Sequence, residues 1–184
     1  YYTVNNRGIL NFFPSERLDK SINYTLLLSG SISDTVGNSI GSDLARSFPT
    51  GDQDIKSETA VDNFESGISD WWQPAQSGST TQNSIIAEET ETIAETSTVN
   101  VLTGSNQALR LNYSWKTGES SYLIREYRNT KQPKFSADKV LQAYVFGDGN
   151  GNKFRFMVRD GNGELEGSTW YNVDWFGWKL VSWD

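Results

Sequence analysis

The sequence predicts an all-β protein, and three observations support this class. Aromatic residues make up 13% of the 184 residues, an enrichment typical of strands. Sixteen glycines stand among many Asn, Ser and Thr residues, which divide the chain into short segments bounded by turns. No long segment repeats its apolar residues at the helical period of about 3.6 residues. Short alternating segments separated by turns therefore indicate antiparallel sheets.

The N-terminal region reads as short strands, which are expected at 1–4, 9–13, 24–29 and 46–48. Turn-forming residues such as Gly8 and Pro14 separate them. Gly37 and Asn38 can adopt positive φ, and Asp34 can accept hydrogen bonds from the amides of the same turn. This region therefore predicts hairpins.

Part of this region has a recognisable pattern. It reads Ser-Ile-Asn-Tyr-Thr-Leu-Leu-Leu-Ser-Gly at 21–30, then Ile-Ser-Asp-Thr-Val-Gly-Asn-Ser-Ile at 32–40, and Ser-Phe-Pro-Thr-Gly at 47–51. The pattern resembles the C-terminal half of a bacterial Ig-like domain of the surface-layer type. The resemblance implies that 1–51 is the C-terminal part of an Ig-like β-sandwich, a fold with about seven strands. The remaining strands lie upstream in a longer protein, or this half packs on the second domain.

Residues 52–60 are polar and charged without apolar periodicity, which predicts a linker. A second domain is expected at 61–184. Its predicted strands are 61–64, 84–88, 93–96, 108–115, 122–127, 140–146, 153–159, 169–175 and 178–184. Glycines in the segment 148–152 predict a hairpin connection. Short strands with Gly and Asn turns describe an antiparallel β-sandwich or jelly roll.

Five segments of this domain carry a second pattern. They are Asp-Asn-Phe-Glu at 62–65, Trp-Trp-Gln-Pro at 71–74, Ala-Leu-Arg-Leu-Asn-Tyr at 108–113, the hairpin at 144–156 and Asp-Trp-Phe-Gly-Trp-Lys at 174–179. The pattern resembles the carbohydrate-binding, galactose-binding-like jelly rolls of secreted bacterial proteins. The resemblance implies a secreted or cell-surface location and neighbouring domains, in some cases a phosphodiester glycosidase. It leaves the ligand open, because this superfold hosts many functions.

Aromatic and arginine side chains are the candidates for ligand binding. In 169–175, Tyr171 and Trp175 share one face and Trp170 and Asp174 the other, because side chains alternate across a strand. A pyranose stacks its apolar face on an aromatic ring while Arg and Asn bond its hydroxyls. The candidate residues are Trp71, Trp72, Trp170, Tyr171, Trp175, Arg110, Arg125 and Arg155. The alternative is that these rings fill the core.

Carboxylates near the two ends of the second domain suggest a calcium site. Many related jelly rolls hold a structural calcium between the first and last strands, with hard oxygen ligands. By this resemblance the candidate ligands are Asp62, Glu65 and Asp184. The alternative is that they are solvated edge charges. The loop 148–152 also resembles a fragment of a calcium loop, but it lacks the final Glu of an EF-hand and is predicted as a turn.

Composition excludes several other functions. The formal charge of −7 argues against nucleic acid, whose binding needs clustered Lys and Arg. The absence of cysteine excludes disulfides, and the absence of histidine removes the commonest general base and zinc ligand. No apolar run is long enough to span a bilayer. Acid pairs such as Asp160 with Glu164, or Glu65 with Asp70, could serve a glycosidase, but none stands out among 23 acidic residues.

The sequence therefore predicts a non-catalytic carbohydrate-binding module of a secreted or surface bacterial protein. Such a module holds polysaccharide near a catalytic partner domain and raises the local concentration of substrate. The chain opens on Tyr-Tyr, so we expect a processed product or a fragment of a longer protein. The alternative is a structural spacer or adhesion module with no sugar affinity, and an enzyme ranks third. Outward display of indole rings would favour the first function.

Overall fold

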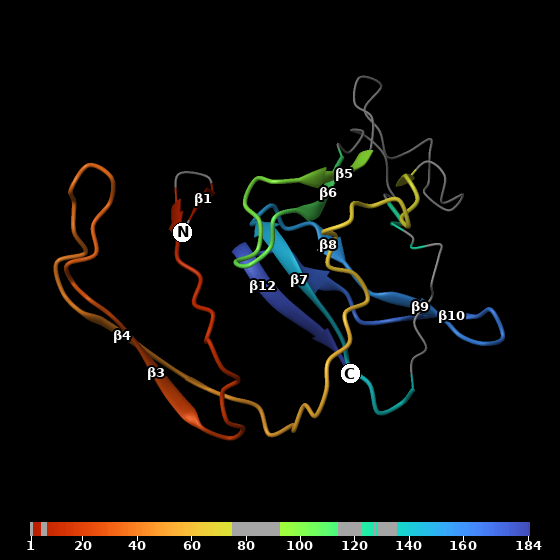
Figure 1. The fold of residues 1–184 in the computed structure, drawn as a ribbon, viewed down its shortest axis with the longest axis horizontal. Coiled ribbons are helices and arrows are strands. Elements are labelled where there is room, and N and C mark those ends of the chain that lie inside the picture. Colours follow the sequence, from red (N-terminus) through yellow and green to blue (C-terminus); the bar gives the residue numbers. More distant parts are fainter. Residues whose placement is uncertain (1, 5–6, 75–92, 114–122, 127, 129–135) are drawn as a thin grey trace. The chain divides into compact units, whose positions relative to one another are not determined.

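The computed structural model describes residues 2–4, 7–74, 93–113, 123–126, 128 and 136–184. In these residues the chain is all-β: its strands pair antiparallel in two-stranded ladders and no α-helix is present (Figure 1). This result confirms the predicted class, while a sandwich arrangement of the sheets stays a prediction. The strand predicted at 84–88 and the end of the strand predicted at 108–115 lie outside the described residues.

The structure divides into two compact units, one of residues 12–59 and the other of residues 1–11 with 60–184. The smaller unit contains β3 (Asn23–Leu28) and β4 (Leu44–Pro49), which pair in register from Asn23 opposite Pro49 to Leu28 opposite Leu44. Half-buried side chains alternate with exposed ones along β3, and Tyr24 stacks on Phe48 with ring centroids 6.1 Å apart. One face of this hairpin is therefore apolar.

The turn at 34–38 has the predicted hydrogen bonds. The carboxylate Oδ1 of Asp34 accepts the backbone N–H groups of Val36 at 3.0 Å and Asn38 at 2.8 Å. The Asn38 side-chain amide donates to Oδ2 at 2.8 Å, and this bond and the backbone bond from Asn38 hold the pKa of Asp34 below its usual value. Gly37 adopts a positive φ of 92°, as expected, whereas Asn38 does not.

The described part of the larger unit contains five ladders. They are β1 (Tyr2–Val4) with β2 (Arg7–Ile9), β5 (Ile93–Ser97) with β6 (Ala108–Asn112), β7 (Leu141–Asp148) with β12 (Phe176–Trp183), β8 (Lys153–Phe154) with β11 (Tyr171–Asn172), and β9 (Met157–Arg159) with β10 (Leu165–Gly167). The ladder of β7 and β12 is the longest (Figure 1). Ala94 and Val181 are the deeply buried apolar side chains of the described core. Strand β10 was not predicted.

The strand predicted at 153–159 is two strands. β8 pairs with β11, whereas β9 pairs with β10, so the partner changes near Ser168. The buried Ser168 hydroxyl accepts the backbone N–H of Phe156 at 3.1 Å, and the Ser168 N–H donates to the Phe156 carbonyl at 3.0 Å. These bonds satisfy the backbone between β8 and β9, so the ladder ends there without leaving those buried groups unpaired.

The predicted terminal strands also differ from the observed ones. β12 begins at Phe176 and runs through Gly177, where a break was expected. Gly177 has a positive φ of 81° and lies opposite Gly147, so two residues without side chains meet inside the ladder. β11 covers only two residues of the strand predicted at 169–175, and it pairs with β8 rather than with the following strand.

Three other expected strands need correction. Residues 61–64 form a turn, because Asp62 Oδ1 accepts the Phe64 N–H at 2.8 Å and Phe64 has a positive φ of 61°. The strand expected at 9–13 ends at Ile9 in β2. Of the strand expected at 122–127, residues 123–126 are described and are not in a strand.

Candidate functional site

A shallow hollow of about 390 Å³ lies over β11 and β12 in the larger unit. Its lining comes from both strands and from the segment between them. The lining residues are Trp170, Tyr171, Asn172, Asp174, Trp175, Lys179, Leu180, Val181 and Ser182. Three of the eight predicted ligand-binding residues therefore meet here, and a fourth, Arg155, contacts Trp170.

Packed aromatic rings form the base of the hollow. The Tyr171 ring stacks on Phe154 with centroids 5.4 Å apart, and its hydroxyl donates to the Ser182 carbonyl at 2.8 Å. The Trp175 indole N–H donates to the Val145 carbonyl at 3.2 Å. A Cβ added at Gly147 would lie 2.6 Å from the same indole, so only glycine leaves room for this ring. Tyr171 and Trp175 are thus fixed parts of the fold, each half-buried.

Trp170 differs from these two rings because it points outward. The residue is 50% exposed, whereas Tyr171 and Trp175 are half-buried, so exposure alternates along this segment as predicted. Its indole N–H has no hydrogen-bond partner among the described residues. By contrast, Trp178 donates its indole N–H to the Asn100 carbonyl at 2.7 Å. The Trp170 ring is therefore available to an external molecule.

Cationic side chains lie near the hollow. The Arg155 guanidinium carbon lies 4.8 Å from the centroid of the Trp170 ring, and the Lys179 ammonium lies 4.6 Å from that of Trp175. Lys153 is exposed and lies opposite Asn172 in the ladder of β8 and β11, so these two share the outer face with Trp170. Sequence reasoning missed both lysines, and the position of Lys153 depends on the pairing of distant strands.

The other predicted ligand-binding residues lie elsewhere. Trp71 donates its indole N–H to Asp62 Oδ2 at 2.9 Å, and its ring packs against Phe64 with centroids 5.7 Å apart. Both contacts are internal to the fold. Trp72 and Arg125 are half-buried away from the lining of the hollow. Arg110 lies opposite Glu95 in the ladder of β5 and β6, with its Nε 3.9 Å from the Glu95 carboxylate.

Two of the carboxylates predicted as calcium ligands have protein partners. Asp62 accepts the Trp71 bond and lies 3.6 Å from Arg128. Glu65 accepts the backbone and side-chain N–H groups of Asn106, both at 2.9 Å, and these bonds lower its pKa. Across the described ranges, no group of three acidic side chains that could hold a metal ion is found. The calcium site of Asp62, Glu65 and Asp184 stays a prediction.

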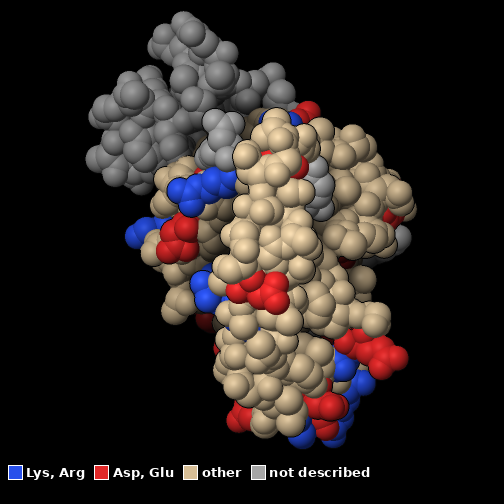
Figure 2. Space-filling model, turned by 90° about the vertical axis from the view of Figure 1, so that its left-hand side faces the viewer, with Lys and Arg blue, Asp and Glu red and all other residues tan. Residues whose placement is uncertain are grey.

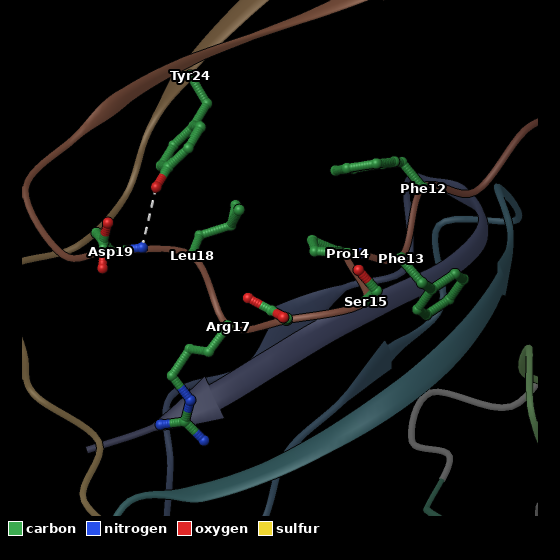
Figure 3. A pocket seen from close by; sticks show the side chains of 9 residues that line it. Phe12, Phe13, Pro14, Ser15, Arg17, Leu18, Asp19 and Tyr24 are labelled. Atoms are coloured by element: carbon green, nitrogen blue, oxygen red, sulfur yellow. Dashed lines mark hydrogen bonds between the residues drawn. The ribbon is translucent and has the colours of Figure 1, made fainter.

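A second hollow, of about 560 Å³, lies in the smaller unit and is lined by residues 12–19 and Tyr24 (Figure 3). The Tyr24 hydroxyl accepts the Asp19 N–H at 3.0 Å, and the side chains of Phe12 and Phe13 point in different directions. Arg17 pairs with Glu58 at 2.9 Å. The cation of this hollow is thus already engaged, which makes the hollow a weaker candidate for ligand binding.

Glu126 is an acidic residue that sequence reasoning did not select. Both of its carboxylate oxygens are buried, and neither has a hydrogen-bond partner in the described part of the chain. Burial raises its pKa to about 7. The pairs considered from the sequence have other partners: Asp160 Oδ1 accepts the N–H groups of Asn162 and Glu164 at 2.9 and 2.7 Å in a turn.

Charged side chains are mixed on the face drawn in Figure 2, where acidic and basic groups lie next to one another among uncharged residues. Among the described residues, no helix has the length and apolar character needed to cross a membrane. No family model matches this chain, and neither a curated protein nor a solved structure matches it. The Ig-like and jelly-roll resemblances therefore stay predictions.

Proposed function

We propose that the unit of residues 1–11 and 60–184 is a non-catalytic carbohydrate-binding module with a jelly-roll arrangement. In this proposal it belongs to a secreted or cell-surface bacterial protein, beside an Ig-like domain. The observation that supports it is Trp170: a half-exposed indole beside a hollow, over rings that the fold holds in place. A large exposed aromatic is costly in water, and a rigid base keeps its face ready for a ligand.

The proposed mechanism is stacking combined with hydrogen bonding. A pyranose ring lies against the Trp170 face, and its hydroxyls exchange hydrogen bonds with the exposed side chains of Asn172 and Asp174. The Trp170 N–H is a further donor for a sugar oxygen. Weak binding of this kind raises the concentration of polysaccharide near a neighbouring catalytic domain, and it requires no catalytic group in the module itself.

Native electrophoresis through gels that contain soluble polysaccharides tests the proposal. We expect retardation by at least one polysaccharide, and an increase of about tenfold in Kd for Trp170→Ala, because loss of ring contact is worth roughly 1.5 kcal/mol. Leu27→Ala is the control, since Leu27 is 63% exposed, lies in the other unit and lines neither hollow. Equal mobility of the wild type in all gels, or equal losses in both variants, would reject the module.

A second candidate function is a structural spacer or adhesion module. The unit of residues 12–59 favours it, because several of its apolar side chains are exposed: Leu27 by 63%, Val36 by 80% and Ile40 by 50%. Exposed apolar surface of this kind is typical of protein contacts. Under this function no polysaccharide retards the chain, and a partner protein covers these residues.

A further inference from the structure

We infer that the ligand of the Trp170 surface is an anionic polysaccharide, whose sugars carry carboxylate or sulfate groups. The inference rests on the proposed function and specifies its substrate class. It starts from the three cations beside the hollow, Lys153, Arg155 and Lys179.

These cations are not neutralised by the protein. None of the three has an acidic partner within 4.0 Å in the described part of the chain, whereas Arg17, Lys20 and Arg110 each have one. The lining itself contains one cation, Lys179, and one acid, Asp174, so the positive excess comes from Lys153 and Arg155 beside it. The local excess is positive although the whole chain carries −7.

The distant negative charges do not cancel this local excess. At an ionic strength of 0.1 M, charges separated by more than about 10 Å are largely screened from one another in water. An anionic group that reaches the hollow therefore interacts mainly with the cations beside it. Three cations are too few for the multiple phosphate contacts of nucleic-acid binding, which commonly number about 6–10.

The contact of Arg155 with Trp170 also favours an anion over a neutral sugar. Arg155 lies over one face of Trp170, so any sugar ring, neutral or anionic, stacks on the other face. An anionic sugar stacked there can in addition pair its charge with the guanidinium, which a neutral pyranose cannot do. The planar guanidinium presents two parallel N–H donors, which match the oxygens of a carboxylate or sulfate.

Gly167 leaves room for this arginine. A Cβ added at Gly167 would lie 3.3 Å from an Arg155 Nη1 and 2.7 Å from the Met157 sulfur. The absence of a side chain at Gly167 therefore lets the guanidinium lie beside Trp170.

The test compares the full chain in native gels that contain dextran, dextran sulfate, polygalacturonate or alginate. We expect retardation by the sulfated or the uronate polymers and little by dextran, the neutral counterpart of dextran sulfate. Retardation by both anionic classes identifies general anion recognition, and retardation by one class identifies sulfate or carboxylate. Raising the salt from about 0.1 M to about 1 M shortens the Debye length from about 10 Å to about 3 Å and should weaken binding.

Variants separate this site from general attraction between charges. Arg155→Gln and Lys179→Gln should each raise Kd about tenfold, because a hydrogen bond to a charged group is worth roughly 1.5 kcal/mol or more. Lys56→Gln removes an exposed cation from the other unit and should leave Kd unchanged. Circular dichroism of each variant shows whether it remains folded, and Arg155→Lys should restore part of the affinity.

Failure of the inference differs from failure of the proposed function. If the chain binds dextran and Trp170→Ala abolishes this binding, the proposed carbohydrate-binding function stands and the inferred specificity for anionic polysaccharides is wrong. No retardation by any polymer would overturn both. Equal retardation by single-stranded DNA, or equal loss in the Lys56 and Arg155 variants, would show nonspecific attraction and would also overturn the inference.

Discussion

Replacing Glu126 by Gln should stabilise the larger unit at neutral and alkaline pH. The carboxylate of Glu126 is buried without a hydrogen-bond partner among the described residues, and burial raises its pKa from 4.5 to about 7. Between these two pH values the folded state keeps a proton that the unfolded state releases. The free energy of unfolding therefore decreases as pH rises through this window and levels off above about pH 7.

The size of the effect follows from the displacement of the pKa. Each pKa unit corresponds to about 1.36 kcal/mol, so a rise of about 2.5 units sets a ceiling of about 3 kcal/mol. The side chain of Glu126 is only half-buried, and water screens part of this cost, which leaves about 2 kcal/mol. Glutamine has the same shape without the charge. In a protein of this size the gain corresponds to about 4–8 °C in Tm above pH 7.

Urea unfolding followed by tryptophan fluorescence measures this gain. All seven tryptophans lie at or after residue 71, so the signal reports on the larger unit. The free energy of unfolding of Glu126→Gln should exceed that of the wild type by about 2 kcal/mol at pH 8 and equal it near pH 4. Glu166→Gln, at an exposed position on β10, is the control and should change little at either pH. A gain that is the same at both pH values, or absent at pH 8, would refute this reasoning.

Three other perturbations test the packing. Gly147→Ala should destabilise the larger unit by about 1–3 kcal/mol in urea unfolding, because the new Cβ would lie 2.4 Å from the Trp175 carbonyl oxygen. Gly161→Ala is the control and should leave the stability unchanged, because a Cβ at Gly161 has no atom within 4 Å. Asp62→Asn weakens the contact with the poorly exposed Arg128 and should lower the unfolding free energy by about 1–2 kcal/mol. Chelator should lower Tm if Asp62, Glu65 and Asp184 bind calcium, because a ligand bound only by the folded state raises Tm, and an unchanged Tm would reject the site.

Residue alternation allowed the sequence to predict which rings share a face, although not which face is exposed. The period of two in a strand separates Trp170 from Tyr171 and Trp175, and the observed exposures agree with this division. The period does not depend on which strand is the partner. It therefore holds even though β11 is only two residues long and pairs with β8.

Features that depend on strand pairing could not be predicted in the same way. Arg155 meets Trp170 only because strand pairing brings two segments together, whereas Lys179 and Trp175 are only four residues apart. Gly177 was expected to end a strand, but the residue opposite it is also a glycine, and the ladder continues. Whether a glycine ends a strand or lies within it depends on the residue opposite it in the ladder. The local sequence does not specify that residue.

The hydrogen bonds of the indole groups separate structural tryptophans from the candidate for ligand binding. Trp71, Trp175 and Trp178 each donate their N–H to a carboxylate or a main-chain carbonyl, as partly buried indoles usually do. Trp170 has no such partner among the described residues, and a cation lies on its ring instead. A ring that only filled the core would be buried with its N–H satisfied. Trp170 meets neither condition, so it is the tryptophan on which the proposed ligand site depends.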